Sequence, residues 1–179
     1  MDYFLSMELS STQLIRINSF HQRVYSSCRS LLSLITSIDE TPNENIMDSI
    51  FAGYSYFMTF DPNNSVLEAA ISSGDIHLIK NDSLKNLLFV WPSMVSDSNE
   101  EEEYAREVLF EQKNFYSKFV REKNIWSSRN RSAFKSNYIE LLKNPDFENK
   151  VHFRSTIVNE IVEEQNDLIE TNDKILALI

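Results

Sequence analysis

The stretch "LIRINSFHQRVYSSCRSLLSLITSI", residues 14–38, decides the fold class. Its apolar and small side chains recur at alternating spacings of three and four residues. The positions on this stripe are Leu14, Ile17, His21, Val24, Cys28, Leu31, Ile35 and Ile38. Such a period is typical of an amphipathic α-helix with one buried face. The pattern predicts a long first helix that runs from about Met7 to the polar segment "DETPNEN" (39–45).

The segment 39–45 is expected to end this helix and to open a second one. Thr41, Pro42 and Glu44 fit the N-cap, first-turn proline and N3 acid of a capping box. The second helix is expected to end near Phe57. Its predicted buried side comprises Ile46, Ile50, Phe51, Tyr54 and Phe57. The first two helices would then form an antiparallel hairpin.

Gly74 is one of only two glycines in the chain. It follows the short helical segment "VLEAAISS" (66–73), where Ser65 and Glu68 have capping-box spacing. The left-handed backbone conformation costs glycine little and other residues about 1 kcal/mol, so Gly74 is expected to end this helix. The segment "DIHLIK" (75–80) is predicted to be an extended link to a helix capped by Asn81 or Asp82.

Pro92 interrupts the next helical segment, residues 83–123. It lacks one backbone hydrogen bond and clashes with the preceding turn, which predicts a kink or a break. Beyond it, Asp97 or Ser98 is expected to cap a long helix that runs to the end of the segment. The acids at 100–103 would lie at the positive end of that helix.

The last part of the chain is predicted to hold a loop and two helices. "NIWSSRNRS" (124–132) is irregular, and a short helix is expected to carry Phe134, Tyr138, Leu141 and Leu142. Asn144 as N-cap and Pro145 at the first position begin the last helix. Its apolar stripe comprises Ile157, Ile161, Leu168 and Ile175.

These elements predict an all-α fold: a single-domain helical bundle over residues 1–179 with three long helices and several short ones. Its parts are a helical hairpin (1–60), a short helix, connector and long helix (61–123), and a loop, short helix and final long helix (124–179). Two glycines and four prolines in 179 residues agree with long helices and short connections.

The net charge of −10 argues against general binding to nucleic acid or to an anionic membrane surface. Cys28 is the only cysteine, so it has no intramolecular disulfide partner. The longest apolar run, residues 87–91, is too short to cross a bilayer, and the N-terminus lacks the pattern of a signal peptide. The chain as given is therefore expected to be soluble.

No catalytic residue, metal ligand or cofactor is predicted. His21, His77 and His152 are far apart in sequence and form no metal-binding motif, and His21 on an apolar stripe is expected to be an interior histidine. Glu100–Glu103 point around the helix rather than at one ion. Cys28 lies in the same stripe as His21, where a thiol is usually inert. The alternative is a soluble hydrolase or metal-dependent enzyme. Its site would lie around one of these histidines and would be formed by residues that only folding brings together.

The candidate partner-binding surface is a basic stretch with one tryptophan. Seven basic residues lie between positions 113 and 135 against a single acid. The proposed contact residues are Arg121, Lys123, Trp126, Arg129 and Arg131. Arginine and aromatic side chains are common interface anchors. The structural alternative is that these cations interact with the negative end of a helix dipole or form ion pairs with the acidic final helix.

Two segments resemble an uncharacterised bacterial family of single-pass membrane-anchored proteins with a helical soluble domain. "VLEAAISSGDIHLIKNDSLKNLL" (66–88) is similar to its characteristic helix, Ser-Gly connector and Asn/Asp-capped helix. "LLKNPDFENKVHFRSTIVNEI" (141–161) is similar to its closing region. The resemblance implies a domain held at the membrane, on its outer side by the positive-inside rule, through a segment that this chain does not contain.

The sequence thus predicts a non-enzymatic interaction or sensory module, the soluble part of a membrane-anchored bacterial protein. The expected partner is a protein. A homodimer is compatible with the apolar stripes, although His21 and Cys28 are poor seam residues for a coiled coil. Light scattering would distinguish a monomer from a homodimer.

Overall fold

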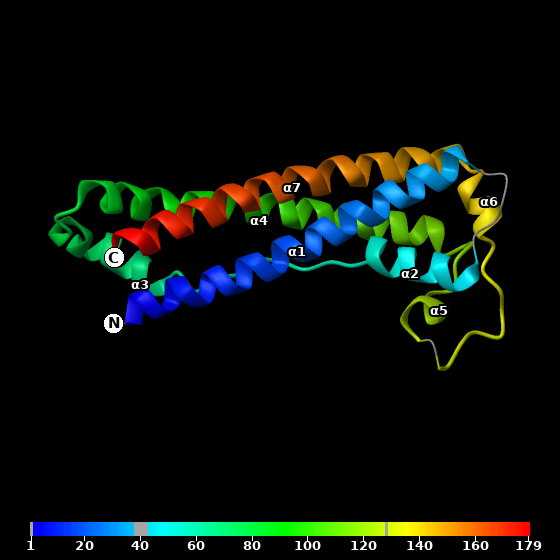
Figure 1. Cartoon of the computed structure of the whole chain (residues 1–179), viewed down its shortest axis with the longest axis horizontal. Helices are drawn as coiled ribbons and strands as arrows, with labels where there is room; N and C mark the ends of the chain where they lie inside the picture. Colours follow the sequence, from blue (N-terminus) through cyan, green and yellow to red (C-terminus); the bar gives the residue numbers. More distant parts are fainter. Residues whose placement is uncertain (1, 38–42, 128) are drawn as a thin grey trace. The chain divides into compact units, whose positions relative to one another are not determined.

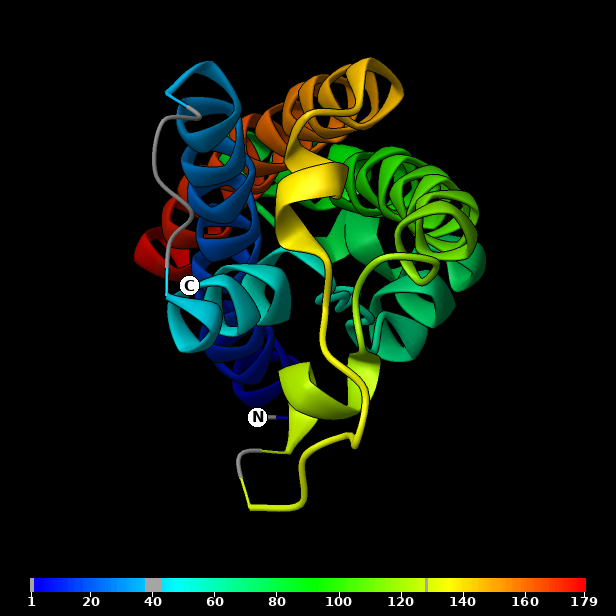
Figure 2. The same cartoon turned by 90° about the vertical axis from the view of Figure 1, so that its right-hand side faces the viewer.

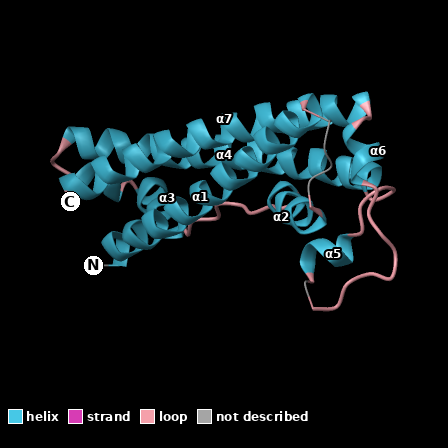
Figure 3. Cartoon of the chain, turned by 45° about the vertical axis from the view of Figure 1, so that its right-hand side comes forward, coloured by secondary structure: helices cyan, strands magenta, loops and turns pink. Residues whose placement is uncertain are grey.

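The structure is a computed structural model that describes residues 2–37, 43–127 and 129–179. Within these residues it has seven α-helices, one 3-10 helix and no strand, so the predicted all-α class is confirmed (Figure 3). The elements, labelled in part in Figure 1, are α1 (Asp2–Thr36), α2 (Glu44–Tyr54), α3 (Ser65–Ser73), η1 (Asp75–Leu78), α4 (Asp82–Tyr116), α5 (Glu122–Trp126), α6 (Tyr138–Leu142) and α7 (Pro145–Leu178).

The chain forms two compact units. Unit 1 comprises Met1–Phe20, Met58–Glu103 and Ile161–Ile179, and unit 2 comprises His21–Phe57 and Tyr104–Glu160. The three long helices α1, α4 and α7 each contribute residues to both units. Each unit has its own apolar core, as a compact helical unit requires.

The core of unit 1 is built from α1, α3, η1, α4 and α7. Its buried apolar residues are Met7, Leu14, Ile17, Phe60, Leu67, Ile76, Leu84, Leu88, Trp91, Val95, Leu168 and Ile175. Helices α1 and α7 run antiparallel here. The Asn18 side chain donates to the Val162 carbonyl at 3.2 Å, and the Asn172 side chain donates to the Met7 carbonyl at 3.5 Å.

The core of unit 2 surrounds Phe51 of α2. The ring of Phe51 lies 5.3 to 5.9 Å from the rings of Tyr54, Tyr116, Tyr138 and Phe147. Aromatic groups at such distances attract one another beyond the area they bury. Residues from α1, α4, α6 and α7 complete this core, among them Val24, Leu31, Val120, Leu141 and Val151.

Arg154 of α7 is buried in unit 2 and donates to three backbone carbonyls. Its guanidinium reaches Tyr54 at 3.1 Å, Tyr56 at 3.0 Å and Ala105 at 3.3 Å. The first two carbonyls lie at the C-terminal end of α2, where helical carbonyls lack intrahelical partners. Arg154 therefore satisfies the end of α2 from inside the core.

The predicted stripe of the first helix is confirmed over most of its length. Six of its positions are buried, from Leu14 through His21 and Cys28 to Leu31. Ile35 is half-buried, and Ile38 lies outside the described residues. The stripe faces the core of unit 1 at its start and that of unit 2 further on.

The prediction for the second helix was wrong at both ends. Thr41 and Pro42 lie outside the described residues, and Asn43 is the N-cap, with its side chain accepting from the Asn45 N–H at 2.8 Å. Glu44 is thus the first helical residue rather than the third. The helix ends at Tyr54, where Ser55 is the C-cap and its N–H donates to the Phe51 carbonyl at 2.8 Å.

The predicted buried side of α2 was right in part. Phe51 and Tyr54 are fully buried, and Ile50 and Phe57 are half-buried. Ile46 is exposed, and its neighbours Met47 and Asp48 are buried instead. The buried face is therefore rotated by one position at the start of the helix. The pattern of apolar residues did not indicate this rotation, because one of the buried residues is charged.

Gly74 ends α3 in the left-handed conformation, with φ 82° and ψ 0°, as predicted. Helix α3 begins at Ser65 after Asn64, so Ser65 is not the N-cap. The prediction of an extended link was wrong, because residues 75–78 form a 3-10 turn that buries Ile76 and leaves Leu78 exposed. Asn81 caps α4 as predicted, accepting from the Leu84 N–H at 3.2 Å.

Helix α4 runs through Pro92 without a break, so the expected new start at Asp97 or Ser98 is wrong. Leu88, Trp91 and Val95 keep their helical spacing in the core of unit 1. Burial of these side chains outweighs a proline penalty of about 3 kcal/mol. The acids 100–103 consequently lie in mid-helix. The helix ends at Tyr116, short of the predicted 123.

The C-terminal predictions fit more closely. Asn144 caps α7, accepting from the Asp146 N–H at 2.9 Å, and Pro145 is its first residue. All four predicted stripe residues of α7, Ile157, Ile161, Leu168 and Ile175, are buried. Helix α6 begins only at Tyr138, so Phe134 precedes it.

Candidate binding surface

The sequence-predicted contact residues lie at the N-cap of α5 (Arg121), on α5 (Lys123 and Trp126) and on the connection that follows it (Arg129 and Arg131). Residues 127 and 129–137, called the anchored loop here, have no helix or strand and lead from α5 to α6 (Figure 2). It is held in place by side chains of unit 2.

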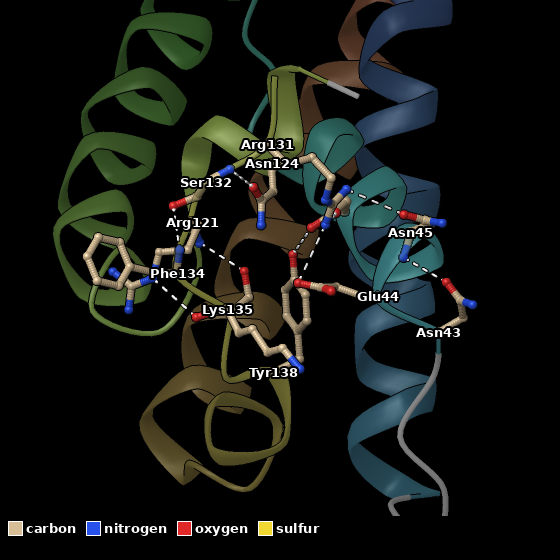
Figure 4. A network of polar contacts seen from close by, with 12 residues as sticks. Asn43, Glu44, Asn45, Arg121, Asn124, Arg131, Ser132, Phe134, Lys135 and Tyr138 are labelled. Atoms are coloured by element: carbon tan, nitrogen blue, oxygen red, sulfur yellow. Dashed lines mark hydrogen bonds and ion pairs between the residues drawn. The ribbon is translucent and has the colours of Figure 1, made fainter. Parts of the chain in front are cut away.

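Arg131 makes the first attachment, to the N-terminal part of α2 (Figure 4). Its guanidinium lies 2.7 Å from a carboxylate oxygen of Asp48 and 3.5 Å from one of Glu44. The Tyr138 hydroxyl donates to the other oxygen of Asp48. The hydrogen bond to Asp48 raises the pKa of Arg131. Burial raises the pKa of Tyr138, and the hydrogen bond to Asp48 adds to the rise.

Backbone contacts make the second attachment. The Ser132 N–H donates to the side chain of Asn124 at 2.7 Å, and the Arg121 N–H donates to the Ser136 hydroxyl at 3.0 Å. The Asn137 N–H donates to the Phe119 carbonyl at 2.8 Å. Buried or half-buried partners thus satisfy the loop backbone at several points, as an ordered loop requires.

The predicted residues fall into two groups. Arg131 and Arg121 are half-buried and have partners: Arg131 is paired as above, and the Arg121 guanidinium donates to the carbonyls of Lys118 at 3.1 Å and Lys135 at 3.4 Å. Lys123, Trp126 and Arg129 are exposed. The acids that pair with Arg131 are on α2, so the alternative of pairing with the acidic final helix was wrong for this residue.

Aromatic side chains mark the outer side of the surface. Trp126 is 53% exposed, and its ring centroid lies 6.1 Å from that of Tyr56. Phe134 is 75% exposed and points away from α2, opposite to Arg131 (Figure 4). Phe134 was expected on the short helix that carries Tyr138, and Asp48 was not predicted as an anchor. An acid inside the otherwise apolar side of α2 was the available signal for Asp48.

The residues considered for chemistry are not brought together within a unit. His21 is buried in unit 2, His152 is exposed there, and His77 is exposed in unit 1, with its ring 5.9 Å from that of Phe89. Among the described residues, no group of three histidine, cysteine or acidic side chains is placed to hold a metal ion. Burial raises the pKa of Cys28 to about 12, so its reactive thiolate is scarce at neutral pH.

Glu102 is a buried carboxyl group in unit 1 that the sequence analysis placed at a solvated helix start. Its two oxygens accept from the Phe60 N–H at 2.8 Å and the Gln165 side chain at 2.6 Å. Burial raises its pKa to about 8, although both hydrogen bonds act in the opposite direction. Glu102 is fully enclosed, so it offers no surface to a substrate.

Comparison with known protein families, with curated proteins and with solved structures finds no match to this chain. In the described part of the chain, no helix combines the length and the apolar composition needed to cross a membrane. The anchored loop and its exposed aromatic and basic residues are therefore interpreted from their geometry.

Proposed function

We propose that this chain is a helical bundle built on its three long helices, and that it acts as a non-enzymatic module that binds a protein partner. The contact surface comprises Lys123, Trp126, Arg129 and Phe134. One observation carries the proposal: part-buried polar contacts hold the loop, while Arg129 and Phe134 on the loop and Lys123 and Trp126 on α5 are exposed.

A loop that is already ordered loses little conformational freedom when a partner binds. Exposed Trp and Phe side chains bury large apolar areas when a partner covers them, and Trp and Arg dominate measured interface energies. Because Arg131 and Asn124 already hold the loop, little further ordering is needed, and the conformational cost of binding is reduced. Exposed Lys123 and Arg129 favour a partner with an acidic rim.

Affinity capture from a lysate of the native cells tests the proposal. The wild-type chain should retain a partner that the Trp126→Ala/Phe134→Ala variant loses. Both residues are exposed, so circular dichroism should show unchanged folding. The charge reversal Arg129→Glu should weaken capture as well. Identical sets of retained proteins for the wild type and the double variant would refute the assigned surface.

We further propose that the module is held at a bacterial membrane by a segment outside this chain, with the module on the outer side. The support is the resemblance of residues 66–88 and 141–161 to a membrane-anchored family. About 20 consecutive apolar residues encoded directly upstream of Met1 would support this anchoring. A polar sequence there would count against an N-terminal anchor.

A further inference from the structure

A second surface of unit 2 is a groove between α4 and α7, which lie side by side (Figure 1). The groove has a volume of about 460 Å³. Its walls include Val108, Glu111 and Phe115 from α4 and Asp146, Lys150 and Phe153 from α7. None of these residues belongs to the anchored loop.

The wall residues follow the period of a helix. On α4 they are three and then four residues apart, and on α7 four and then three. Each wall therefore extends over two turns, roughly 10 Å along the helix axis. Side chains of a third helix at positions i, i+3 or i+4, and i+7 have the same repeat, which is the usual match between a helix and a two-helix groove.

The floor of the groove is fixed before anything binds. Gln112 is 3% exposed, its carbonyl oxygen accepts from the Tyr54 hydroxyl at 2.5 Å, and its amide donates to the Lys150 backbone carbonyl at 2.9 Å. This side chain bridges α4 and α7. A groove that keeps its shape when empty loses little conformational freedom on binding.

The open side of the groove carries apolar rings. Phe153 is 46% exposed and meets Tyr104, 47% exposed, edge to face with ring centroids 6.4 Å apart. At the other end, Phe115 is half-buried. Half-exposed rings at both ends of a groove provide anchor sites for apolar side chains of a partner.

The carboxylates of the groove favour a basic partner. Glu111 and Asp146 are exposed on opposite walls, and neither forms an ion pair with another residue in the described ranges. Two cations lie over the Phe115 ring: the ammonium of Lys150, which lines the groove, at 5.4 Å from the ring centre, and that of Lys118, which does not line it, at 6.0 Å. The lining thus presents two unpaired carboxylates and one cation held against a ring.

We propose that this groove binds an amphipathic helix of another protein. The helix would place apolar side chains at i, i+3 or i+4, and i+7 against Val108, Phe115 and Phe153. Lysine or arginine on its flanks would lie beside Glu111 and Asp146. This surface is separate from the anchored loop, so its test does not depend on the partner proposed above.

Two fluorescently labelled, helix-stapled synthetic peptides test the inference by fluorescence anisotropy. Both carry leucine at i, i+3 and i+7, and one has lysine on its flanks where the other has glutamate. The basic peptide should bind the full chain with a micromolar dissociation constant, and the acidic twin should bind at least about tenfold more weakly. Equal binding of the two, or no saturable binding of the basic peptide below about 1 mM, would overturn the proposal.

Three variants locate the binding. Phe153→Ala should lower the affinity for the basic peptide by about tenfold. Glu111→Lys/Asp146→Lys should make the chain prefer the acidic peptide over the basic one. Phe110→Ala is the matched control, because Phe110 is 57% exposed on α4 but does not line the groove. If Phe153→Ala lowers the melting temperature, the charge reversal at the two exposed acids still shows whether the peptide binds in the groove. A preference unchanged by that reversal would refute the groove as the site.

Discussion

Glu102 shows how a single carboxyl group can make the stability of unit 1 depend on pH. Its pKa rises from an ordinary value near 4.5 to about 8 in the folded chain. Between these values the folded state keeps a proton that the unfolded chain has released. The contribution of Glu102 to stability is therefore full below about pH 4.5 and is lost as the pH rises through 8.

We expect the Glu102→Gln variant to remove this pH dependence. Its amide can accept from the Phe60 N–H and donate to Gln165 after the amide of Gln165 rotates, so the contacts of the neutral acid are kept. Between pH 5 and pH 8, the free energy of unfolding measured in urea should fall on the order of 3 kcal/mol further for the wild type than for the variant. Parallel curves for the two proteins would show that Glu102 does not titrate in this range.

Glu103→Gln is the matched control for this measurement. Glu103 is the next residue along α4 and is exposed, whereas Glu102 is fully buried. Loss of an exposed carboxylate usually changes stability by no more than about 0.5 kcal/mol. The control should therefore keep most of the pH dependence of the wild type, since it retains the enclosed carboxyl group and loses only the smallest contribution to its raised pKa, the charge of Glu103.

At the level of elements, α1 and α2 meet at Gly53, where the two helices approach closely. A Cβ atom on Gly53 would lie 2.1 Å from the Ser27 hydroxyl oxygen and 3.2 Å from its Cβ. The Ser27 hydroxyl donates to the Arg23 carbonyl at 3.0 Å, so it would have to leave that bond to make room. Glycine is thus needed here for contact between helices rather than for backbone freedom.

We expect Gly53→Ala to destabilise unit 2 by about 1 to 2 kcal/mol, because the clash exceeds the helical preference of alanine over glycine. Ser27→Ala removes the nearest atom. The double variant Ser27→Ala/Gly53→Ala should therefore recover most of the loss, which a double-mutant cycle in urea would measure as a coupling energy. Additive effects of the two substitutions would place the cause outside this contact.

The anchored loop yields a second prediction at this scale. Arg131→Met removes the contacts to Asp48 and Glu44 but keeps a long apolar side chain. Amide hydrogen exchange in residues 129–137 should speed up by tenfold or more, while that of α7 stays unchanged, because the loop opens without unfolding the unit. Arg129→Met is the control, since Arg129 is exposed. Equal exchange in both variants would mean that the backbone contacts alone hold the loop.

The elements differ in how far the sequence could predict them. Gly74, Asn81 and Asn144 end or begin helices through local backbone chemistry, and each was predicted correctly. A break at Pro92, one of the two outcomes expected there, and an extended link at residues 75–78 do not occur, because tertiary burial of Trp91 and Ile76 overrides the local preference there. Local signals placed these three helix ends but not the starts expected at Thr41 and Ser65, and packing decides whether a disfavoured residue stays inside a helix.

The candidate binding surface stays a prediction, and its residues were chosen from composition alone. A tryptophan among cations indicated Lys123, Trp126 and Arg129, which are exposed. That Arg131 faces inward depends on Asp48, 83 residues away along the chain. A contact between residues so far apart leaves no periodic pattern, so the division into anchoring and outward residues needed the structure.

At the scale of the whole molecule, the division into two compact units leaves little trace in the sequence. Domain boundaries usually lie in glycine- or proline-rich linkers. The long helices α1, α4 and α7 instead contribute residues to both units without such a linker. The buried polar groups differ between the units: Glu102 lies in unit 1 and Arg154 in unit 2. Acid and alkali should therefore affect the two units differently.

The placement of Trp91 and Cys28 gives each unit a spectroscopic or chemical reporter of its own. Trp91 is fully buried in unit 1, and in a Trp126→Phe background it is the only tryptophan, so its emission follows the melting of that unit alone. Cys28 is the only thiol and is fully buried in unit 2, so its rate of reaction with a disulfide reagent follows the opening of that unit. Comparing the two signals in one denaturant series would measure how cooperatively the halves of this chain unfold.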